Sequence, residues 1–174
     1  MMHMRFLMAL VLIGFLSLSS CAEKSDDTTL TTLYFIRHAE KDRSNPNNKD
    51  PHLTATGNQR AIYWSEVLKN VKFEAIYSTD YKRTVETASP TAKNNNLKIQ
   101  IYNANILDTD KLLSENRGNN VLIVGHSDTT PKFVNKFLGT ESYQDIDDSN
   151  NGNLYILTFT DTMITDLLLV VNPQ

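Results

Sequence analysis

The sequence is poor in several features, and each shortage excludes a class of protein. Its 174 residues include one cysteine, so no disulfide can form within the chain. The 17 basic and 20 acidic residues leave a net charge of −3, which gives no electrostatic case for a nucleic-acid partner. At this length we expect one domain of ordinary size rather than two.

The N-terminal residues have the composition of an export signal. Arg5 precedes an apolar run from Phe6 to Leu16, about half the ~20 residues of a membrane-spanning helix, which is typical of a signal-peptide core. The following Leu18-Ser19-Ser20-Cys21 resembles the lipobox of bacterial lipoproteins, where cleavage precedes a cysteine that is then acylated. We therefore expect a signal peptide over residues 1–20 and a lipidated Cys21. An uncleaved signal anchor is the alternative.

This interpretation implies an exported protein that is lipid-anchored to a bacterial membrane at the cell envelope. Acyl chains contribute about 0.8 kcal/mol per buried CH₂, so several chains on Cys21 would hold the protein on the membrane. Residues 21–29 are short, polar and without periodicity, as expected of a tether. The folded domain is then expected over residues 30–174.

Two apolar runs in that domain end in a histidine. Leu33–Ile36 and Val121–Val124 are continuous apolar runs, typical of strands that are covered on both faces in a parallel sheet. Arg37 and His38 follow the first run, and His126 closely follows the second. Because functional groups collect at the carboxyl ends of parallel strands, these side chains are expected to meet.

The remaining pattern alternates between helices and strands. Thr54 is a plausible N-cap of a helix with an apolar stripe through Ala61, Trp64 and Leu68, and Phe73–Tyr77 resembles a strand. The other expected elements are a helix capped by Thr79 or Asp80 that carries Arg83 and is bent or shortened by Pro90, a strand over Lys98–Tyr102, a short helix around Lys111–Glu115, a helix capped by Thr130 and ended by Gly139, and a hairpin of strands over Leu154–Thr160 and Met163–Val170. This order predicts a three-layer α/β/α sandwich with a mainly parallel central sheet and an antiparallel edge.

Four segments carry a family resemblance. They are Arg37-His38-Ala39-Glu40-Lys41, Leu53-Thr54 with Gly57, Gln59 and Ala61, the segment from Ser78 to Ala88 that contains Arg83, and Gly125-His126-Ser127. In this order they resemble the Arg-His-Gly signature, the helix opening, the second-arginine segment and the second-histidine motif of the histidine phosphatase superfamily, which also contains the phosphoglycerate mutases. Four ordered segments are far more specific than a lone Arg-His pair.

The resemblance implies the chemistry of the site. The family's nucleophile is the histidine of its first motif, so His38 is expected to form a phosphohistidine. Phosphoryl transfer is promoted by positioning and by cationic donors, so Arg37, Arg83 and His126 are expected to bind the phosphoryl oxygens. These four residues form the predicted catalytic set, with no metal and no cofactor. Ala39 replaces the glycine of the signature and adds a methyl group beside the nucleophile.

The proton donor for the leaving group is not evident. Many family members carry a carboxylate after the third strand, but this window offers Asn103 and Asn105, and an amide has no titratable proton to donate. Asp108 is the first candidate, followed by Glu40 and Asp128. Without a positioned acid, substrates with good leaving groups, such as acyl phosphates or phosphohistidine, would be hydrolysed best.

The leading functional interpretation is a metal-independent phosphomonoester hydrolase that acts on a phosphorylated substrate. Three alternatives stay open. They are phosphoglycerate mutase-like phosphotransfer, a metal-dependent hydrolase that uses His38, Glu40, His126 and Asp128, and a non-catalytic lipoprotein that binds phosphorylated ligands.

Overall fold

The structure, a computed structural model, describes residues 29–106 and 108–173. Cys21, the predicted signal peptide and all but the last residue of the predicted tether lie outside the described residues, so these stay predictions. None of the described helices is long and apolar enough to span a membrane.

Ten elements alternate along the chain much as the pattern predicts. The strands are β1 (Thr31–Arg37), β2 (Ala75–Thr79), β3 (Ile99–Tyr102), β4 (Asn120–Gly125), β5 (Asn153–Phe159) and β6 (Ile164–Val170). The helices are α1 (Ala55–Val67), α2 (Lys82–Asn94), α3 (Thr109–Glu115) and α4 (Thr129–Leu138).

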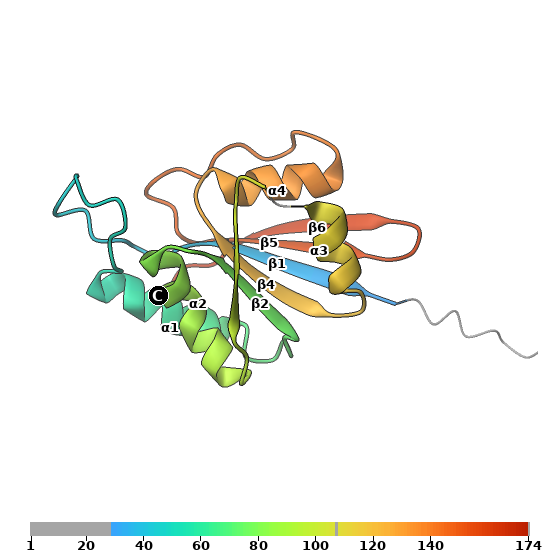
Figure 1. The fold of residues 1–174 in the computed structure, drawn as a ribbon, viewed down its shortest axis with the longest axis horizontal. Helices are drawn as coiled ribbons and strands as arrows, with labels where there is room; N and C mark the ends of the chain where they lie inside the picture. Colours follow the sequence, from blue (N-terminus) through green and yellow to red (C-terminus); the bar gives the residue numbers. More distant parts are fainter. Residues whose placement is uncertain (1–28, 107, 174) are drawn as a thin grey trace, which may run out of the picture.

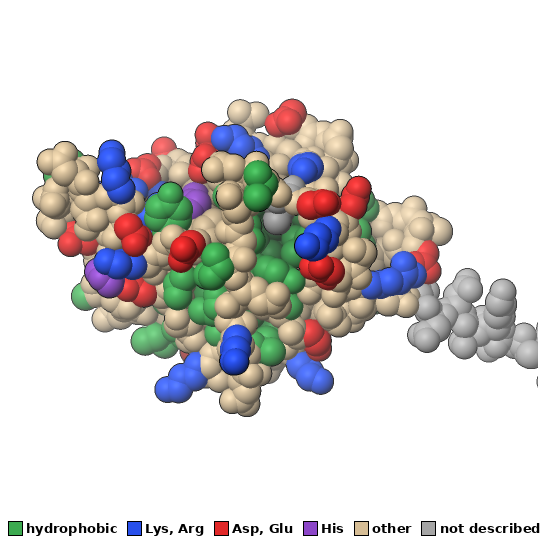
Figure 2. All heavy atoms as spheres, viewed as in Figure 1, with side chains coloured by type: hydrophobic (Ala, Val, Ile, Leu, Met, Phe, Trp, Pro, Cys, Tyr) green, Lys and Arg blue, Asp and Glu red, His purple; other side chains and the backbone are tan. Residues whose placement is uncertain are grey.

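The six strands form one sheet in the order β3-β2-β4-β1-β5-β6 (Figure 1). The pairs β2/β3, β2/β4 and β1/β4 are parallel, whereas β1/β5 and β5/β6 are antiparallel. The mainly parallel sheet with an antiparallel edge is therefore confirmed. The strand β3 lies at the other edge and is partly exposed, and Figure 2 shows hydrophobic side chains gathered near it between α2 and α3.

Helices cover both faces of this sheet, which confirms the three-layer sandwich (Figure 1). On one face, Trp64 of α1 and Ala88 of α2 pack against Ile76 and Leu122 of the sheet. On the other face, α4 packs on apolar side chains of β1, β4 and β5. Because β1 and β4 lie between two layers, their side chains are apolar on both sides, and this explains the continuous runs in the sequence.

The predicted starts of two helices are wrong, whereas Thr54 caps α1 and Gly139 ends α4 as predicted. The residue before α2 is Tyr81, not Thr79 or Asp80, because β2 runs on to Thr79 and the hydroxyl of Thr79 faces other partners. Similarly, α4 begins at Thr129 after Asp128, so Thr130 lies inside the helix and is buried.

Pro90 does not shorten α2, which continues to Asn94. The predicted end of this helix in the asparagine cluster is confirmed, since Asn95 follows the last helical residue and Asn96 has a positive φ of 54°. Packing of α2 on α1 and the sheet, through buried residues such as Ala88 and Ala92, overrides the local effect of the proline.

Trp64 fills the layer between α1 and the sheet and is completely buried. We expect Trp64→Ala to lower the free energy of unfolding by about 3–5 kcal/mol, because it leaves a large cavity. The matched control is Ile62→Ala on the exposed side of the same helix, where 57% of the residue is exposed and the change should stay within about 0.5 kcal/mol. Urea unfolding measures both. Equal losses in the two variants would contradict the assigned core.

Candidate active site

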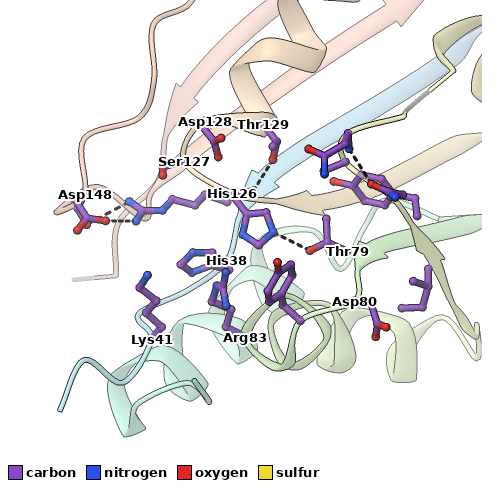
Figure 3. A pocket seen from close by; sticks show the side chains of 17 residues that line it. His38, Lys41, Thr79, Asp80, Arg83, His126, Ser127, Asp128, Thr129 and Asp148 are labelled. Atoms are coloured by element: carbon purple, nitrogen blue, oxygen red, sulfur yellow. Dashed lines mark hydrogen bonds and ion pairs between the residues drawn. The ribbon is translucent and has the colours of Figure 1, made fainter. Parts of the chain in front are cut away.

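A cleft of about 900 Å³ opens at the carboxyl ends of β1, β2, β3 and β4 (Figure 3). Its lining comprises Arg37, His38, Lys41, Thr79, Asp80, Tyr81, Arg83, Ile101, Tyr102, Asn103, Ala104, Asn105, His126, Ser127, Asp128, Thr129 and Asp148. All four residues of the predicted catalytic set are therefore brought together, as the strand-end argument predicts.

The pairing of β1 with β4 places the two histidines side by side. In their parallel register Arg37 lies opposite Gly125, and the backbone N–H of His38 donates to the Gly125 carbonyl at 2.9 Å. His38 and His126 thus leave the sheet at the same level, and their ring centroids are 5.6 Å apart.

The protonation of His38 follows from one contact. Its Nδ1 lies 2.7 Å from the carbonyl oxygen of Ala39, which can only accept, so Nδ1 carries the hydrogen. Burial lowers the pKa of His38 to about 3, and the nearby charges of Arg37 and Arg83 act in the same direction against the opposing backbone bond. The ring is therefore neutral at neutral pH, with the lone pair on Nε2.

The second motif segment supports the backbone of the first. Thr54 caps α1 by accepting from the N–H of Gly57, and its own N–H donates to the Glu40 carbonyl at 2.9 Å. A Cβ at Gly57 would lie 2.2 Å from that same carbonyl oxygen. Glycine is therefore required here, because the helix start lies directly on the chain that follows His38.

Arg37 is held by a loop that sequence reasoning missed. Its Nη1 donates to the carbonyls of Asp147 (2.9 Å), Asp148 (3.2 Å) and Asn150 (2.9 Å), and Nη2 donates to the Asp148 carboxylate at 2.6 Å. The side chain is 2% exposed, and its Nε is buried without a hydrogen-bond partner. These contacts fix the guanidinium in place.

Asp148 carries a second ion pair, to Arg43 at 2.7 Å. Hydrogen bonds from Arg43 and then Arg37 lower the pKa of Asp148 to about 2, so it stays ionised at neutral pH. In the same loop, the side-chain amide of Asn151 donates to the His38 carbonyl at 2.8 Å. Neither residue belongs to a recognisable motif, and a separation of more than 100 residues from Arg37 hides them from pattern reasoning.

Arg83 lies in the first turn of α2, as predicted. Its guanidinium is 4.3 Å from the centre of the Tyr81 ring and 4.0 Å from the Asp50 carboxylate, and its Nε is buried without a partner. Burial lowers its pKa, yet an arginine stays charged in proteins. A second fixed cation therefore lines the cleft.

His126 is half-buried at the end of β4. Its Nε2 lies 2.9 Å from the hydroxyl of Thr79, and its backbone N–H donates to the hydroxyl of Thr129 at 3.1 Å. Burial lowers the pKa of His126 to about 4, the charge of Arg83 adds to this, and Asp128 opposes it. This ring is also neutral at neutral pH.

A family model now complements the geometry. The model of the histidine phosphatase superfamily (branch 1) matches residues 33–104. The resemblance to this superfamily is confirmed. The matched range contains Arg37, His38 and Arg83 and ends before His126. The match supports a phosphatase or phosphoglycerate mutase-like enzyme.

Solved structures show the same fold at low sequence identity. Bacillus stearothermophilus YhfR has a TM-score of 0.66 at 17% identity, with 82% of this chain and 98% of that chain covered. A putative phosphohistidine phosphatase SixA from Agrobacterium tumefaciens has 0.61 at 18%, with 80% and 97% covered. Phosphoglycerate mutase from Bacillus anthracis str. Sterne has 0.62 at 18%, with 82% and 94% covered. No curated protein matches the sequence.

Two of the expected proton donors lie away from the cleft. Asp108 caps α3 by accepting from the N–H of Lys111 at 3.0 Å, and it lines a separate hollow of about 210 Å³. Glu40 pairs with Arg60 at 2.8 Å and is not part of the cleft lining. The tertiary placement of these carboxylates therefore gives no support to Asp108 or Glu40 as the acid.

Other carboxylates do line the cleft. Asp128 lies 3.5 Å from Lys132, and in Figure 3 both it and Asp80 lie away from the His38 ring. Asn103 and Asn105 line the cleft in the window where many family members carry their acid.

Ala39 and the predicted metal ligands are also placed by the fold. Ala39 is completely buried in a small cluster with Leu53 and Ala61 and is not part of the cleft lining, so its added methyl group does not narrow the cleft. Within the described residues, no three His, Cys, Asp or Glu side chains gather as metal ligands. The set proposed for a metal-dependent hydrolase is therefore not assembled.

The lowered pKa values of the two histidines predict a pH-dependent stability. Each pKa is lower in the folded protein than its unfolded value of about 6.5, so the stabilisation is fully present above that pH and is lost as the pH falls toward the folded values. We expect the urea midpoint to fall between about pH 6.5 and 4.5, and to fall less in His38→Gln, which cannot take up the proton.

The matched control is His52→Gln, because His52 is 64% exposed and does not line the cleft. Its urea midpoint should follow the wild-type pH dependence. An unchanged pH dependence in His38→Gln would contradict a buried, neutral His38.

Proposed function

We propose that the chain is a metal-independent phosphomonoester hydrolase that works through a phosphohistidine on His38. The observation that carries this proposal is the bond from Nδ1 of His38 to the Ala39 carbonyl. It fixes the tautomer whose Nε2 lone pair is free, and burial beside cations keeps that lone pair unprotonated. A neutral, oriented imidazole in a cleft is what nucleophilic attack on phosphorus requires.

The surrounding cations supply the charge that the reaction needs. Arg37 and Arg83 each keep a buried Nε without a partner and lie in the cleft with His38. Charge on the equatorial oxygens of the transferring group is stabilised by such fixed donors, which need no reorganisation during the reaction. Lys41 adds a further cation to the cleft lining.

The reaction divides into two displacements. In the first, Nε2 of His38 bonds to phosphorus, the bond from phosphorus to the leaving oxygen breaks, and its electron pair stays on the leaving group. In the second, water bonds to phosphorus and the phosphorus–nitrogen bond breaks, returning its electron pair to Nε2. Two moderate barriers replace one high barrier.

The leaving group defines the preferred substrates. Amides stand at positions 103 and 105, and the labelled carboxylates Asp80 and Asp128 lie away from the His38 ring (Figure 3). A poor leaving group would therefore have to depart without protonation by a nearby acid. Acyl phosphates and phosphohistidine carry good leaving groups, a carboxylate and an imidazole. They are therefore the substrate classes that fit this cleft. The fold's similarity to the Agrobacterium tumefaciens protein, a putative phosphohistidine phosphatase, accords with this class.

A phosphoenzyme experiment tests the reaction. Wild-type protein quenched during turnover of a labelled acyl phosphate should carry an acid-labile, base-stable phosphoryl group. Turnover should persist when a metal chelator is present. The kcat of His38→Asn should be at least about 10³-fold lower than that of the wild type. His52→Asn is the matched control. Full activity in His38→Asn contradicts covalent catalysis. Tight phosphate binding without turnover would instead indicate a non-catalytic lipoprotein that binds phosphorylated ligands. Transfer of the label from the enzyme to added phosphoglycerate would indicate a mutase.

Lipidation of Cys21 is the second part of the proposed function, and it is supported by the lipobox resemblance alone. With a clickable fatty acid fed to an expressing bacterium, the wild-type chain should become labelled and membrane-bound. Cys21→Ser should lose both properties while the folded domain keeps its activity. Labelling that survives in Cys21→Ser would contradict this anchor.

A further inference from the structure

Two threonines form a short hydrogen-bond chain behind His126. The Thr79 hydroxyl lies 2.9 Å from Nε2 of His126 and 2.9 Å from the Thr84 hydroxyl (Figure 3 shows the contact with His126). Thr79 is 3% exposed and Thr84 is completely buried. The bonds must therefore be satisfied almost entirely within the protein.

The contacts of Thr84 give this chain a direction. Its hydroxyl oxygen lies 2.8 Å from the Tyr81 carbonyl and 3.0 Å from the Thr79 carbonyl, and carbonyls only accept. The single hydroxyl hydrogen of Thr84 therefore points to a carbonyl, and its oxygen accepts from Thr79. One hydrogen cannot serve both carbonyls, so one of these two contacts lacks a hydrogen in this direction, whereas in the reverse direction both would lack one.

Thr79 therefore donates its hydroxyl hydrogen to the Thr84 oxygen. The Thr79 oxygen then has only lone pairs to offer to Nε2 of His126. Nε2 of His126 must therefore carry a hydrogen, and in the neutral ring the lone pair lies on Nδ1. The neutral ring then has no N–H left for a phosphoryl oxygen, which differs from the sequence-based expectation that His126 binds the phosphoryl group. The two histidines thus have opposite tautomers, since His38 carries its hydrogen on Nδ1 and keeps Nε2 free.

The groups around His126 keep it neutral until a phosphoryl group arrives. Positive charge comes from Arg83, Lys41 and Arg37, and among the described residues Asp128 is the charge that opposes it. The Tyr81 ring meets His126 edge to face at 5.1 Å, and His38 is its other aromatic neighbour. The negative charge of a phosphohistidine would offset these cations and make Nδ1 a better proton acceptor.

We propose that Thr84 and Thr79 are positioning residues that hold His126 as the Nε2–H tautomer, so that its Nδ1 takes a proton from the water that hydrolyses the phosphohistidine. This inference rests on the proposed function. The water oxygen bonds to phosphorus, the phosphorus–nitrogen bond to His38 breaks with its electrons returning to Nε2, and the water proton moves to Nδ1 of His126. The proton then passes to solvent. His126 serves the second displacement, which leaves the demand for a good leaving group in the first unchanged.

The decisive variant is Thr79→Val, which keeps the branched shape and removes the oxygen. We expect the hydrolysis of phospho-His38 to slow by about 10²-fold, while its formation from a good acyl phosphate changes little. Phosphoenzyme should therefore accumulate during turnover, as rapid-quench labelling would show. Thr79→Ser keeps the hydroxyl and should hydrolyse phospho-His38 at most of the wild-type rate. Thr84→Val should slow this hydrolysis less than Thr79→Val does, and Thr84→Ser should restore it. A purely structural role would slow both displacements together.

The outcomes separate this inference from the proposed function. Equal hydrolysis rates for phosphoenzyme in Thr79→Val and wild type would overturn the chain of threonines while leaving the phosphohistidine intact. Absence of any phosphoenzyme in wild type would overturn the proposed function and, with it, the assigned proton transfer. The tautomer itself is tested without variants by nitrogen NMR of histidine-labelled wild-type protein. A hydrogen on Nδ1 of neutral His126, instead of Nε2, would overturn the positioning role whatever the kinetics.

Discussion

The site depends on the parallel pairing of β1 with β4. Both strands are buried between helical layers, and a shift of register by one residue would exchange the side chains of the two apolar layers and disrupt the packing of both. This burial locks Arg37 opposite Gly125, and the bond from His38 N–H to Gly125 carries the pairing one residue past the strand. The 5.6 Å between the rings of His38 and His126 follows from that register.

Burial and charge then act together on the imidazoles. Desolvation and neighbouring guanidinium groups both disfavour a protonated ring, so the cations that would hold a phosphoryl group also keep the nucleophile free of protons. Fixed hydrogen bonds decide where each lone pair lies: the Ala39 carbonyl orients His38, and the Thr79 hydroxyl orients His126. A cationic cleft with neutral histidines suits an anionic substrate and nucleophilic chemistry.

The segment between α4 and β5 completes the site from a distant part of the chain. It is tied to the second-histidine motif by the bond from Ile146 N–H to the Ser127 carbonyl at 2.8 Å. It also holds Arg37 through backbone carbonyls and Asp148, and holds the His38 backbone through Asn151. The backbone carbonyls orient the guanidinium without adding charge, and the Asp148 carboxylate pairs with it at 2.6 Å, so this segment fixes where Arg37 lies in the cleft.

The sequence by itself determined the layers and the four side chains at the strand ends, because buried parallel strands require continuous apolar runs and end at one edge of a sheet. Arg37, His38 and His126 could therefore be placed from the apolar runs that precede them, as could Arg83 in its helix. Only the tertiary structure decided which groups surround them. Asp108 looked close along the chain but caps α3, whereas Asp148 is distant along the chain and touches Arg37. Loop contacts and hydroxyl directions follow no periodicity, so they appear only once the chain is folded.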